Sequence, residues 1–272
     1  DNMSRGTGPV DIIADLTQAD TYRGLPKDWD HVYLLAGIVG VANVESAPRR
    51  ALEVNTQTVL RLLAWLPKDA RLFFASTSEV YAGSVTAGIA PVPTPEQVPL
   101  SVPDLLNPRF AYATSKILGE AAITYSSANA VIGRFHNVYG PRMGTDHAIP
   151  ALMLRMARRP TLCQIYGPQQ RRAFCYIDDA VEQMIALMDT DYRGVVNLGN
   201  DAEEITIEEL AGEIAYALDL DEVMIERLPA PPGSVERRCP DLTRLRSLIA
   251  YGAKVKLADG LEKTRAWYLD RG

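Results

Sequence analysis

The chain has 272 residues, of which 47% are hydrophobic and 23% are charged, and its net charge at pH 7 is -6. This composition is typical of a globular protein that forms one domain or two unequal lobes. The negative charge argues against nucleic acid as the main partner, and no apolar run approaches the length of a membrane span.

The cysteines, Cys163, Cys175 and Cys239, lie far apart and lack the spacing of metal ligands. We therefore expect neither a disulfide framework nor a structural metal site. Reduced thiols, together with the absence of a signal-peptide pattern, predict a cytoplasmic protein without membrane contact.

Alternation of apolar runs with helical patterns predicts the fold of the first half. Short runs have the composition of strands buried on both faces at 10–14, 31–36, 71–75 and 130–135. Helical patterns at 48–66 and 110–126 alternate with these runs. This order predicts an α/β protein with a parallel, doubly wound sheet.

The later half predicts a smaller C-terminal lobe. The expected elements are a strand at 195–198 and helices at 150–159, 205–218 and 255–268. Thr206 and Glu209 have the spacing of a capping box at the start of the second of these helices. The loops at 90–108 and 228–241 are too rich in proline for regular structure.

Tyr112 and Lys116 are four residues apart and share one face of the helix expected at 110–126. A phenol is a weak base at neutral pH because its usual pKa is ~10, and a nearby ammonium lowers that pKa. Tyr112 is therefore a candidate base for a substrate hydroxyl, although any helix can carry this spacing.

Polar residues also follow the apolar strands. Thr77, Ser78 and Glu79 end the run that begins at Arg71. Ligands of parallel sheets bind beyond the carboxyl ends of strands. A hydroxyl of Thr77 or Ser78 is thus expected to contact the oxygen that Tyr112 deprotonates, with Glu79 as a second acid or base. The alternative is an ordinary turn or helix cap.

Asn137 follows the run at 130–135 in the same way, with an Asx turn as the alternative. The arginine pairs at 171–172 and 237–238 match a diphosphate clamp, because guanidinium groups bind phosphate in bidentate fashion. Surface salt bridges are the alternative for these arginines.

Five segments occur in order along the chain: ASTSEVY (75–81), YATSK (112–116), FHNVYGPRM (135–143), RRAFCYIDDAV (171–181) and RRCPD (237–241). Together they resemble the extended short-chain dehydrogenase/reductase family, and within it the nucleotide-sugar epimerases, dehydratases and decarboxylases. The resemblance covers nearly the whole chain and implies a Rossmann-like fold, the cofactor NAD, a UDP- or dTDP-sugar substrate and a homodimer.

The resemblance also assigns roles to residues. Tyr112 is the base, Lys116 its cationic partner, and Thr77 the hydroxyl partner, with Ser78 and Glu79 as further catalytic candidates. The residues implied in cofactor binding are Asp1, Asn2, Asp15, Leu16, Leu35, Ala36, Gly37, Asn55, Ala75, Tyr112, Lys116 and Phe135. Those implied in substrate binding are Thr77, Asn137, Arg142, Arg172, Arg238 and Asp241. The implied NAD-binding domain comprises 1–140 and 171–200, and the nucleotide-sugar lobe comprises 141–170 and 201–272.

The start of the chain departs from the family pattern. The family begins with a strand, a glycine-rich turn and a helix that hold the cofactor pyrophosphate. This sequence opens at DNMSRG, which resembles the end of the second strand, with Asp1 as the ligand of the adenine ribose. We expect ~30 upstream residues to be missing because the sequence is incomplete or the protein is truncated. The third interpretation is a protein that binds NAD poorly.

Three fates of a 4-keto sugar are open. Hydride return to the other face gives C4 epimerisation, loss of a C6 carboxylate gives decarboxylation, and proton removal from C5 by Glu79 gives 4,6-dehydration. The sequence favours C4 epimerisation of a UDP-hexose or UDP-glucuronate, with UDP-glucuronate decarboxylation or 4,6-dehydration as alternatives. Arg172 and the hydroxyls of Thr77 and Ser78 are expected to meet a uronate carboxylate. A hypothesis of a different class is a nucleotide-sugar-binding protein without turnover.

Overall fold

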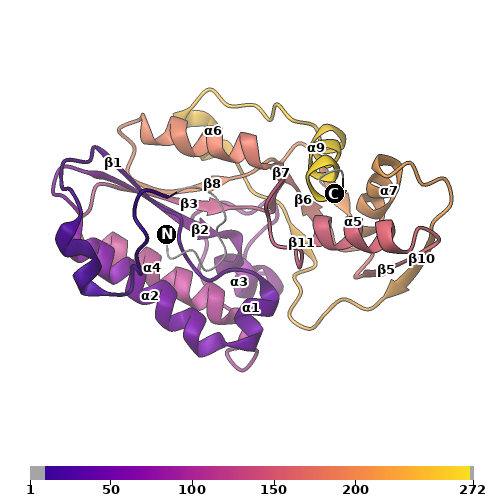
Figure 1. Ribbon diagram of the computed structural model, residues 1–272, viewed down its shortest axis with the longest axis horizontal. Helices are drawn as coiled ribbons and strands as arrows, with labels where there is room; N and C mark the ends of the chain where they lie inside the picture. The colour runs from indigo at the N-terminus through magenta and orange to yellow at the C-terminus, as the bar shows by residue number, and fades with distance from the viewer. Residues whose placement is uncertain (1–9, 270–272) are drawn as a thin grey trace.

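The computed structural model describes residues 10–269. Within these residues the largest sheet has four parallel strands in the order β1-β2-β3-β8. The strands are β1 (His31–Leu34), β2 (Arg71–Thr77), β3 (Ala130–Phe135) and β8 (Gly194–Leu198). Helices α2 (Pro48–Trp65) and α4 (Ala111–Tyr125) cover one face, and α6 (Ile177–Met188) covers the other (Figure 1). The predicted doubly wound α/β fold is confirmed.

The alternation of side chains along β2 explains why both faces of the sheet are covered. Leu72 and Phe74 belong to the apolar cluster beneath α2 and α4, whereas Phe73 between them belongs to the cluster beneath α6. All three are buried. Because successive strand residues point to opposite faces, a continuous apolar run of this kind is stable only between two layers of helices.

One predicted strand is wrong. Residues 10–14 form no strand, and Ile12 and Ile13 expose 50% and 72% of their surface. Among the described residues the main sheet ends at β1, and this segment is not one of its strands, so a short apolar run is not sufficient to specify a strand.

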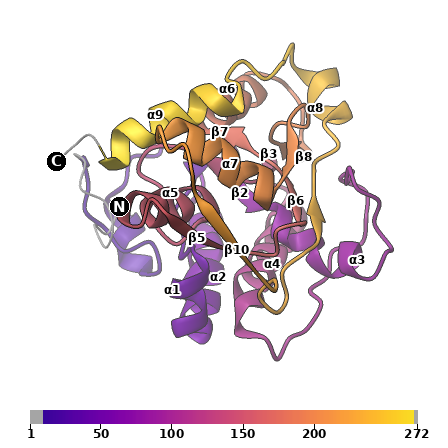
Figure 2. The same cartoon turned by 90° about the vertical axis from the view of Figure 1, so that its right-hand side faces the viewer.

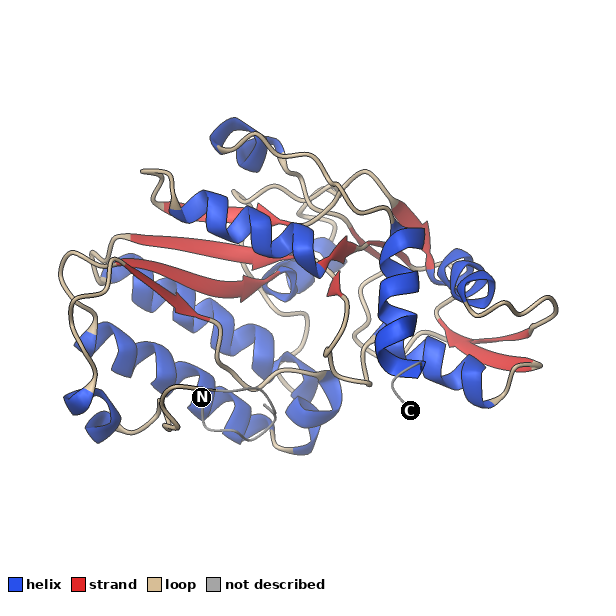
Figure 3. Cartoon of the chain, turned by 45° about the horizontal axis from the view of Figure 1, so that its top comes forward, coloured by secondary structure: helices blue, strands red, loops and turns tan. Residues whose placement is uncertain are grey.

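A smaller lobe packs beside the carboxyl ends of the main strands (Figures 1 and 2). It contains α5 (Ala148–Arg158), β5 (Leu162–Tyr166), α7 (Ile207–Ala217), β10 (Met224–Leu228) and α9 (Leu257–Leu269). Strands β5 and β10 form a parallel pair that stands apart from the main sheet (Figure 3).

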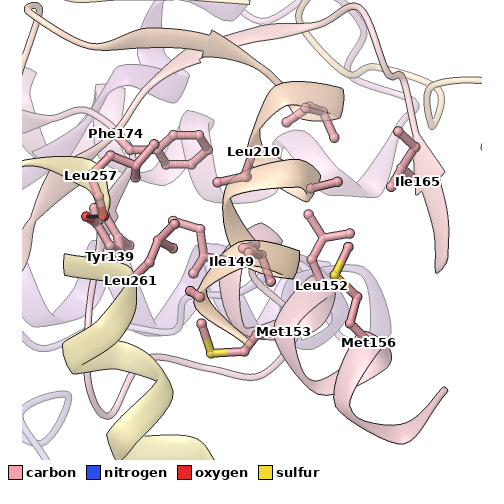
Figure 4. Close-up of a cluster of buried hydrophobic side chains, with 14 of the residues drawn as sticks. Tyr139, Ile149, Leu152, Met153, Met156, Ile165, Phe174, Leu210, Leu257 and Leu261 are labelled. Carbon is pink, nitrogen blue, oxygen red and sulfur yellow. Dashed lines mark hydrogen bonds between the residues drawn. The ribbon is translucent and has the colours of Figure 1, made fainter. Parts of the chain in front are cut away.

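The core of this lobe is a cluster of buried side chains from α5, α7 and α9 (Figure 4). Met153, Leu210 and Leu261 are fully buried in it, and the Tyr139 hydroxyl donates to the Leu257 carbonyl at 3.2 Å. The predicted capping box of α7 is confirmed, with Thr206 Oγ1 accepting from Glu209 N and Glu209 Oε2 accepting from Thr206 N.

Short elements join the two parts. Strands β6 (Arg171–Ala173), β9 (Glu204–Thr206) and β11 (Arg237–Arg238) form a small sheet, and β4 (Val138–Tyr139) pairs with β7 (Cys175–Tyr176). The remaining elements are η1 (Ala19–Gly24), α1 (Val41–Ser46), η2 (Ser78–Tyr81), α3 (Ala82–Thr86), η3 (Pro108–Phe110) and α8 (Thr243–Leu248). Among residues 10–269, the helices are all too short or too polar to cross a lipid bilayer.

Candidate active site

Two adjoining cavities lie at the carboxyl ends of β2 and β3. The first cavity, of about 460 Å³, is lined by Leu35, Thr77, Tyr112, Lys116 and Phe135, among others. The second cavity, of about 360 Å³, reaches into the smaller lobe. Both cavities are lined by Val41, Glu79, Arg109, Asn137, Val138, His147 and Arg238. The two cavities therefore form one cleft between the main sheet and the smaller lobe.

Tyr112 and Lys116 lie on α4 at the wall of the first cavity. The Lys116 ammonium is buried, donates to the Ala75 carbonyl at 2.7 Å, and lies 5.7 Å from the centre of the Tyr112 ring. Thr77, at the end of β2, lines the same cavity as Tyr112 and favours its ionised form. The structure thus brings the predicted base, its cation and its hydroxyl partner to one place.

The expected lowering of the Tyr112 pKa is not observed. Burial raises the pKa of the Tyr112 phenol above its usual value, and the Glu79 carboxylate raises it further, while the hydrogen bond with Thr77 acts in the opposite direction. The sequence indicated the ammonium of Lys116 near Tyr112 but not how deeply the Tyr112 phenol is buried. Loss of water around the phenolate therefore outweighs the cation in the protein alone.

Burial also lowers the pKa of Lys116 to about 8, against a partial opposing effect of Glu120. Below pH 8 the charged Lys116 side chain therefore lowers the free energy of unfolding. This cost disappears as the pH rises from about 8 to the ordinary lysine pKa of ~10.4.

We therefore expect Lys116→Met to raise the free energy of unfolding by about 1 to 3 kcal/mol at pH 7. The gain should shrink between pH 8 and ~10.4, because the wild-type lysine becomes neutral there. Urea unfolding of both proteins at several pH values measures the difference. A gain that is absent at pH 7, or that grows with pH, would contradict a buried ammonium.

Glu79 lies among arginines where the two cavities meet. Its Oε1 atom is 2.9 Å from Arg238 Nη1 and 3.6 Å from Arg109 Nη2. Burial by itself would raise the pKa of the Glu79 carboxyl, but Arg238, Arg109 and Arg172 together hold it below its usual value. Glu79 is therefore ionised at neutral pH and paired to Arg238.

Two guanidinium nitrogens in this cluster are buried without a hydrogen-bond partner among the described residues: Arg109 Nε and Arg238 Nη2. Buried donors are normally satisfied, and exceptions indicate a ligand or solvent that completes them. Both side chains line the cleft. The cluster therefore has donors for an anion.

A buried polar network supports α4 and β3 behind the cleft. Arg134 Nη2 and Glu120 Oε2 are 2.5 Å apart, and Arg134 Nε contacts both oxygens of the same carboxylate at 2.9 and 3.2 Å. Ser76 donates to Glu120 at 2.5 Å, and Arg134 donates to the Tyr81 hydroxyl at 2.7 Å. These bonds fix the strand end that carries Thr77 against the helix that carries Lys116.

The residues predicted near the cofactor divide into three groups. Leu35, Ala75 and Phe135 line the first cavity. Asp15 and Leu16 do not line either cavity: Asp15 accepts from Thr17 in an exposed turn, and Leu16 packs against the core under α2. Asp1 and Asn2 lie outside the described residues.

Asn55 on α2 holds the loop that follows β1. Its Oδ1 atom accepts from Ile38 N at 2.7 Å, and its Nδ2 atom donates to Ile38 O and to Ser115 Oγ, both at 3.1 Å. A Cβ on Gly37 would lie 3.1 Å from Asn55 Oδ1, so glycine permits this close approach. Ala36 and Gly37 are themselves exposed beside the cleft entrance.

The predicted substrate-binding residues differ in whether they line the cavities. Asn137, with φ 42, donates to the Ala173 carbonyl at 2.9 Å and lines both cavities. Arg142 stacks over Trp267 with 5.0 Å to the ring centre, and Asp241 accepts from Thr243 N at the start of α8. Neither Arg142 nor Asp241 lines the first or second cavity.

Arg172 lines only the second cavity, and its guanidinium is occupied by protein oxygens. It donates to the carbonyls of Arg171, Glu236 and Val235 at 2.8, 3.1 and 2.6 Å. Burial and the neighbouring Arg238 lower the pKa of Arg172 to about 9. Arg172 therefore braces the segment before Arg238, and its expected contact with a uronate carboxylate is not supported.

Of the polar residues that line both cavities, two were not predicted as site residues. Arg109 lies three positions before Tyr112, and His147 precedes α5; both line the two cavities. The only sequence signal for Arg109 is its position beside YATSK, because the ion pair with Glu79 joins residues far apart in the chain. His147 has no such signal, since it is brought in by the smaller lobe.

The first cavity fits the nicotinamide part of NAD. Its largely apolar lining, with Leu35, Val39 and Phe135, accepts a flat ring, and the buried Lys116 ammonium is a donor for a ribose hydroxyl. Lys116 and Tyr112 would hold the cofactor ribose, with Leu35 and Phe135 beside the ring.

Residues 10–269 contain no group of three or more histidine, cysteine or acidic side chains suited to a metal ion.

This fold and this Tyr-Lys pair at the strand ends define an extended short-chain dehydrogenase/reductase. Residues 8–199 match the model of the NAD dependent epimerase/dehydratase family, and the chain belongs to this family. The predicted cofactor, NAD, is confirmed by the family, and the chain is an enzyme of nucleotide-sugar chemistry rather than a binding protein without turnover.

The chain is similar to curated decarboxylases. It is 28% identical to UDP-glucuronic acid decarboxylase 5 of Arabidopsis thaliana over 96% of this chain and 76% of that protein. It is 29% identical to the UDP-N-acetyl-alpha-D-glucosaminuronate decarboxylase of Bacillus cytotoxicus, over 96% and 84%.

A solved epimerase has the same fold. It is the UDP-N-acetylglucosamine 4-epimerase from Methanobrevibacter ruminantium M1, with a TM-score of 0.81 and 25% identity, covering 96% of this chain and 83% of that one.

Proposed function

We propose that this protein oxidises UDP-glucuronate at C4 and removes its C6 carboxylate as carbon dioxide, giving the UDP-pentose. The observation that carries this proposal is the cluster of Glu79, Arg109 and Arg238 beside Tyr112, which has unpaired donors for one acidic group at the sugar end of the cleft. The similarity to two uronate decarboxylases supports the same substrate class.

The first step is proton removal from the C4 hydroxyl. Tyr112 accepts this proton, and the side chain of Thr77, which lines the same cavity, is placed to donate to the same oxygen. Tyr112 and Lys116 would hold the ribose of NAD, which would supply the acceptor for the C4 hydride. The buried Lys116 lies 5.7 Å from the centre of the Tyr112 ring and favours its phenolate.

The C4 ketone makes the sugar a β-keto acid, in which the C5–C6 bond breaks readily. Carbon dioxide leaves, and its bonding electron pair moves to the C4 oxygen as an enolate. The Tyr112 hydroxyl, which now carries the proton, stabilises this enolate by a hydrogen bond. C5 then takes a proton from solvent, and Tyr112 returns its own proton to O4 when the ketone is reduced.

Glu79 is poorly suited to remove the C5 proton of a 4,6-dehydratase reaction. Its carboxylate is 2.9 Å from Arg238, and the surrounding arginines lower its pKa. A carboxylate in this state is a weak base. Instead, Glu79 and the substrate carboxylate both pair with Arg109 and Arg238. The substrate carboxylate is therefore bound without being strongly stabilised against its loss as carbon dioxide.

C4 epimerisation of UDP-glucuronate is the second candidate. It was ranked first from the sequence, and the similarity to a 4-epimerase structure supports it. Epimerisation requires the keto sugar to turn over in the cleft, which would break the contact of its carboxylate with the arginine cluster. Decarboxylation needs no such rotation, and we rank it first for this reason.

The test is incubation of the purified protein with NAD and a panel of UDP- and dTDP-sugars, followed by liquid chromatography and mass spectrometry. We expect UDP-glucuronate to lose the mass of carbon dioxide. An unchanged mass at a new retention time would establish epimerisation instead, and loss of the mass of water would establish dehydration. Turnover of neutral sugars but not of UDP-glucuronate would exclude the proposal.

We also propose that the two parts divide the ligands, with NAD held by 1–140 and 171–200 and the nucleotide sugar by 141–170 and 201–272. The apolar cluster beneath α2 and α4 comes from the first set alone, and most of the cluster in the smaller lobe comes from the second, which supports this division. The cluster beneath α6 combines both sets, because Leu242 and Leu245 pack into it. Limited proteolysis with and without UDP should show protection of the second set only. Protection of the first set alone would contradict it.

We further propose a homodimer through α2 and α4. Leu60, Leu118 and Tyr125 on these helices expose 51%, 46% and 86% of their surface. Neighbouring exposed apolar side chains of this size are typical of an interface. Sedimentation velocity should give a dimer for the wild type and a monomer for Leu118→Asp. A wild-type monomer at micromolar concentration would contradict the proposal.

A further inference from the structure

We propose that Arg109 binds the C6 carboxylate of the substrate and thereby selects a nucleotide-linked uronic acid over the neutral hexose. This inference deepens the proposed function and rests on it for the position of the sugar. It replaces the expectation that Arg172 and the strand-end hydroxyls meet the carboxylate.

The contacts of the three cleft arginines differ. The Arg172 guanidinium donates to protein carbonyls. Arg238 is paired to Glu79 at 2.9 Å and keeps one buried nitrogen, Nη2, without an acceptor among the described residues. Arg109 makes only a longer contact, 3.6 Å from Nη2 to Glu79 Oε1, and its buried Nε atom has no acceptor among residues 10–269. Arg109 is therefore the cleft arginine with the most capacity for a new acidic partner.

The charges lead to the same conclusion. Glu79 carries one negative charge and lies within 4 Å of two guanidinium groups, those of Arg109 and Arg238. The Arg109 side chain is only 16% exposed, so its charge is poorly solvated. A carboxylate from the substrate supplies the missing charge and accepts from the planar guanidinium in its preferred bidentate geometry.

The position of Arg109 distinguishes the sugar acid from the diphosphate. Arg109 lines the first cavity together with Tyr112 and Lys116, whereas Arg172 lines only the second. The base acts at O4, and C6 is two bonds away from C4. A carboxylate anchor three residues before the base is therefore suitably placed for C6, while the diphosphate extends toward the smaller lobe.

The backbone around Arg109 is held firmly. Asn107 Oδ1 caps η3 by accepting from Arg109 N at 3.1 Å, and Phe110 is buried. A Cβ on Gly233 would lie 3.0 Å from Asn107 and 3.2 Å from Phe110, so the loop at Gly233 packs closely over this turn. These contacts hold the backbone turn that carries Arg109 at the start of the helix that carries Tyr112.

The experiment compares Tyr112→Phe with Tyr112→Phe/Arg109→Gln, since the first substitution prevents consumption of the ligand. Isothermal titration calorimetry gives the Kd of UDP-glucuronate, UDP-glucose and UDP for both proteins. We expect Arg109→Gln to weaken UDP-glucuronate binding by about 10- to 100-fold and to change UDP-glucose and UDP binding by less than about threefold. Arg49→Gln, a surface change on α2, is the control and should leave all three Kd values unchanged.

Equal weakening of all three ligands would assign Arg109 to the diphosphate and overturn the inference, as would an unchanged Kd for UDP-glucuronate. If Arg109→Gln does not fold, Arg109→Lys decides: it keeps the charge but loses the bidentate fork, and should selectively weaken UDP-glucuronate binding. If Tyr112→Phe itself binds UDP-glucuronate no better than UDP-glucose, the proposed function fails rather than the role of Arg109 alone.

Discussion

Replacing Tyr112 by phenylalanine is expected to lower the turnover of UDP-glucuronate by about 100- to 10,000-fold, the usual contribution of a positioned general base. Tyr112 lines the first cavity together with Thr77, and the Lys116 ammonium lies 5.7 Å from the centre of its ring. Phenylalanine keeps the ring and its packing but removes the proton acceptor. Stopped assays read by mass spectrometry, with NAD in excess, measure the loss.

Tyr125→Phe is the matched control for this variant. Tyr125 lies at the far end of the same helix, α4, and exposes 86% of its surface. We expect Tyr125→Phe to retain full turnover and Tyr112→Phe to retain the wild-type affinity for UDP. Turnover of Tyr112→Phe within about a factor of three of the wild type would remove the phenol from the mechanism.

The second large effect concerns stability. We expect Arg134→Met to lower the free energy of unfolding by about 3 to 5 kcal/mol, because the buried Glu120 carboxylate loses its ion pair. Arg134 contacts Glu120 through both its Nε and Nη2 atoms and also donates to Tyr81, with both partners of the pair almost fully buried. Urea unfolding followed by circular dichroism gives the free energy.

The double variant Arg134→Met/Glu120→Leu tests the cause. It removes both charges and should be more stable than Arg134→Met alone, since no unpaired carboxylate remains. Arg49→Met breaks an exposed pair with Glu53 and should cost at most about 1 kcal/mol. A loss of similar size for Arg134→Met and Arg49→Met would mean that burial of the inner pair has no energetic consequence.

The pattern of apolar residues was sufficient for most of the elements. β3 covers the predicted run at 130–135, and α2 (Pro48–Trp65) and α4 (Ala111–Tyr125) differ from their predicted bounds by only one residue at each affected end. These elements pair their backbone groups in regular hydrogen bonds or bury one face. Both arrangements produce a periodic pattern of apolar residues in the sequence. The run at 10–14 is not a strand in the structure, because a short apolar run does not by itself distinguish a strand from an irregular segment.

Sequence motifs located part of the candidate site. The motifs correctly placed Tyr112, Lys116 and Thr77 at one site, because the spacing along a helix and the end of a strand are both local features of the sequence. Arg142 and Asp241 belonged to equally good motifs, yet one stacks on Trp267 and the other caps α8. Whether a side chain faces a cleft depends on the packing of its own element, which a motif does not specify.

The amino-acid sequence alone determined the layered α/β fold, the family and the Tyr-Lys pair, because apolar patterns and short motifs are both read directly from the order of residues along the chain. Only the tertiary structure brought Arg109 and Arg238 to the same oxygen of Glu79 and made burial raise the pKa of Tyr112. Ion pairing and desolvation depend on which distant residues surround a group. These properties arise only when the smaller lobe closes over the carboxyl ends of the sheet.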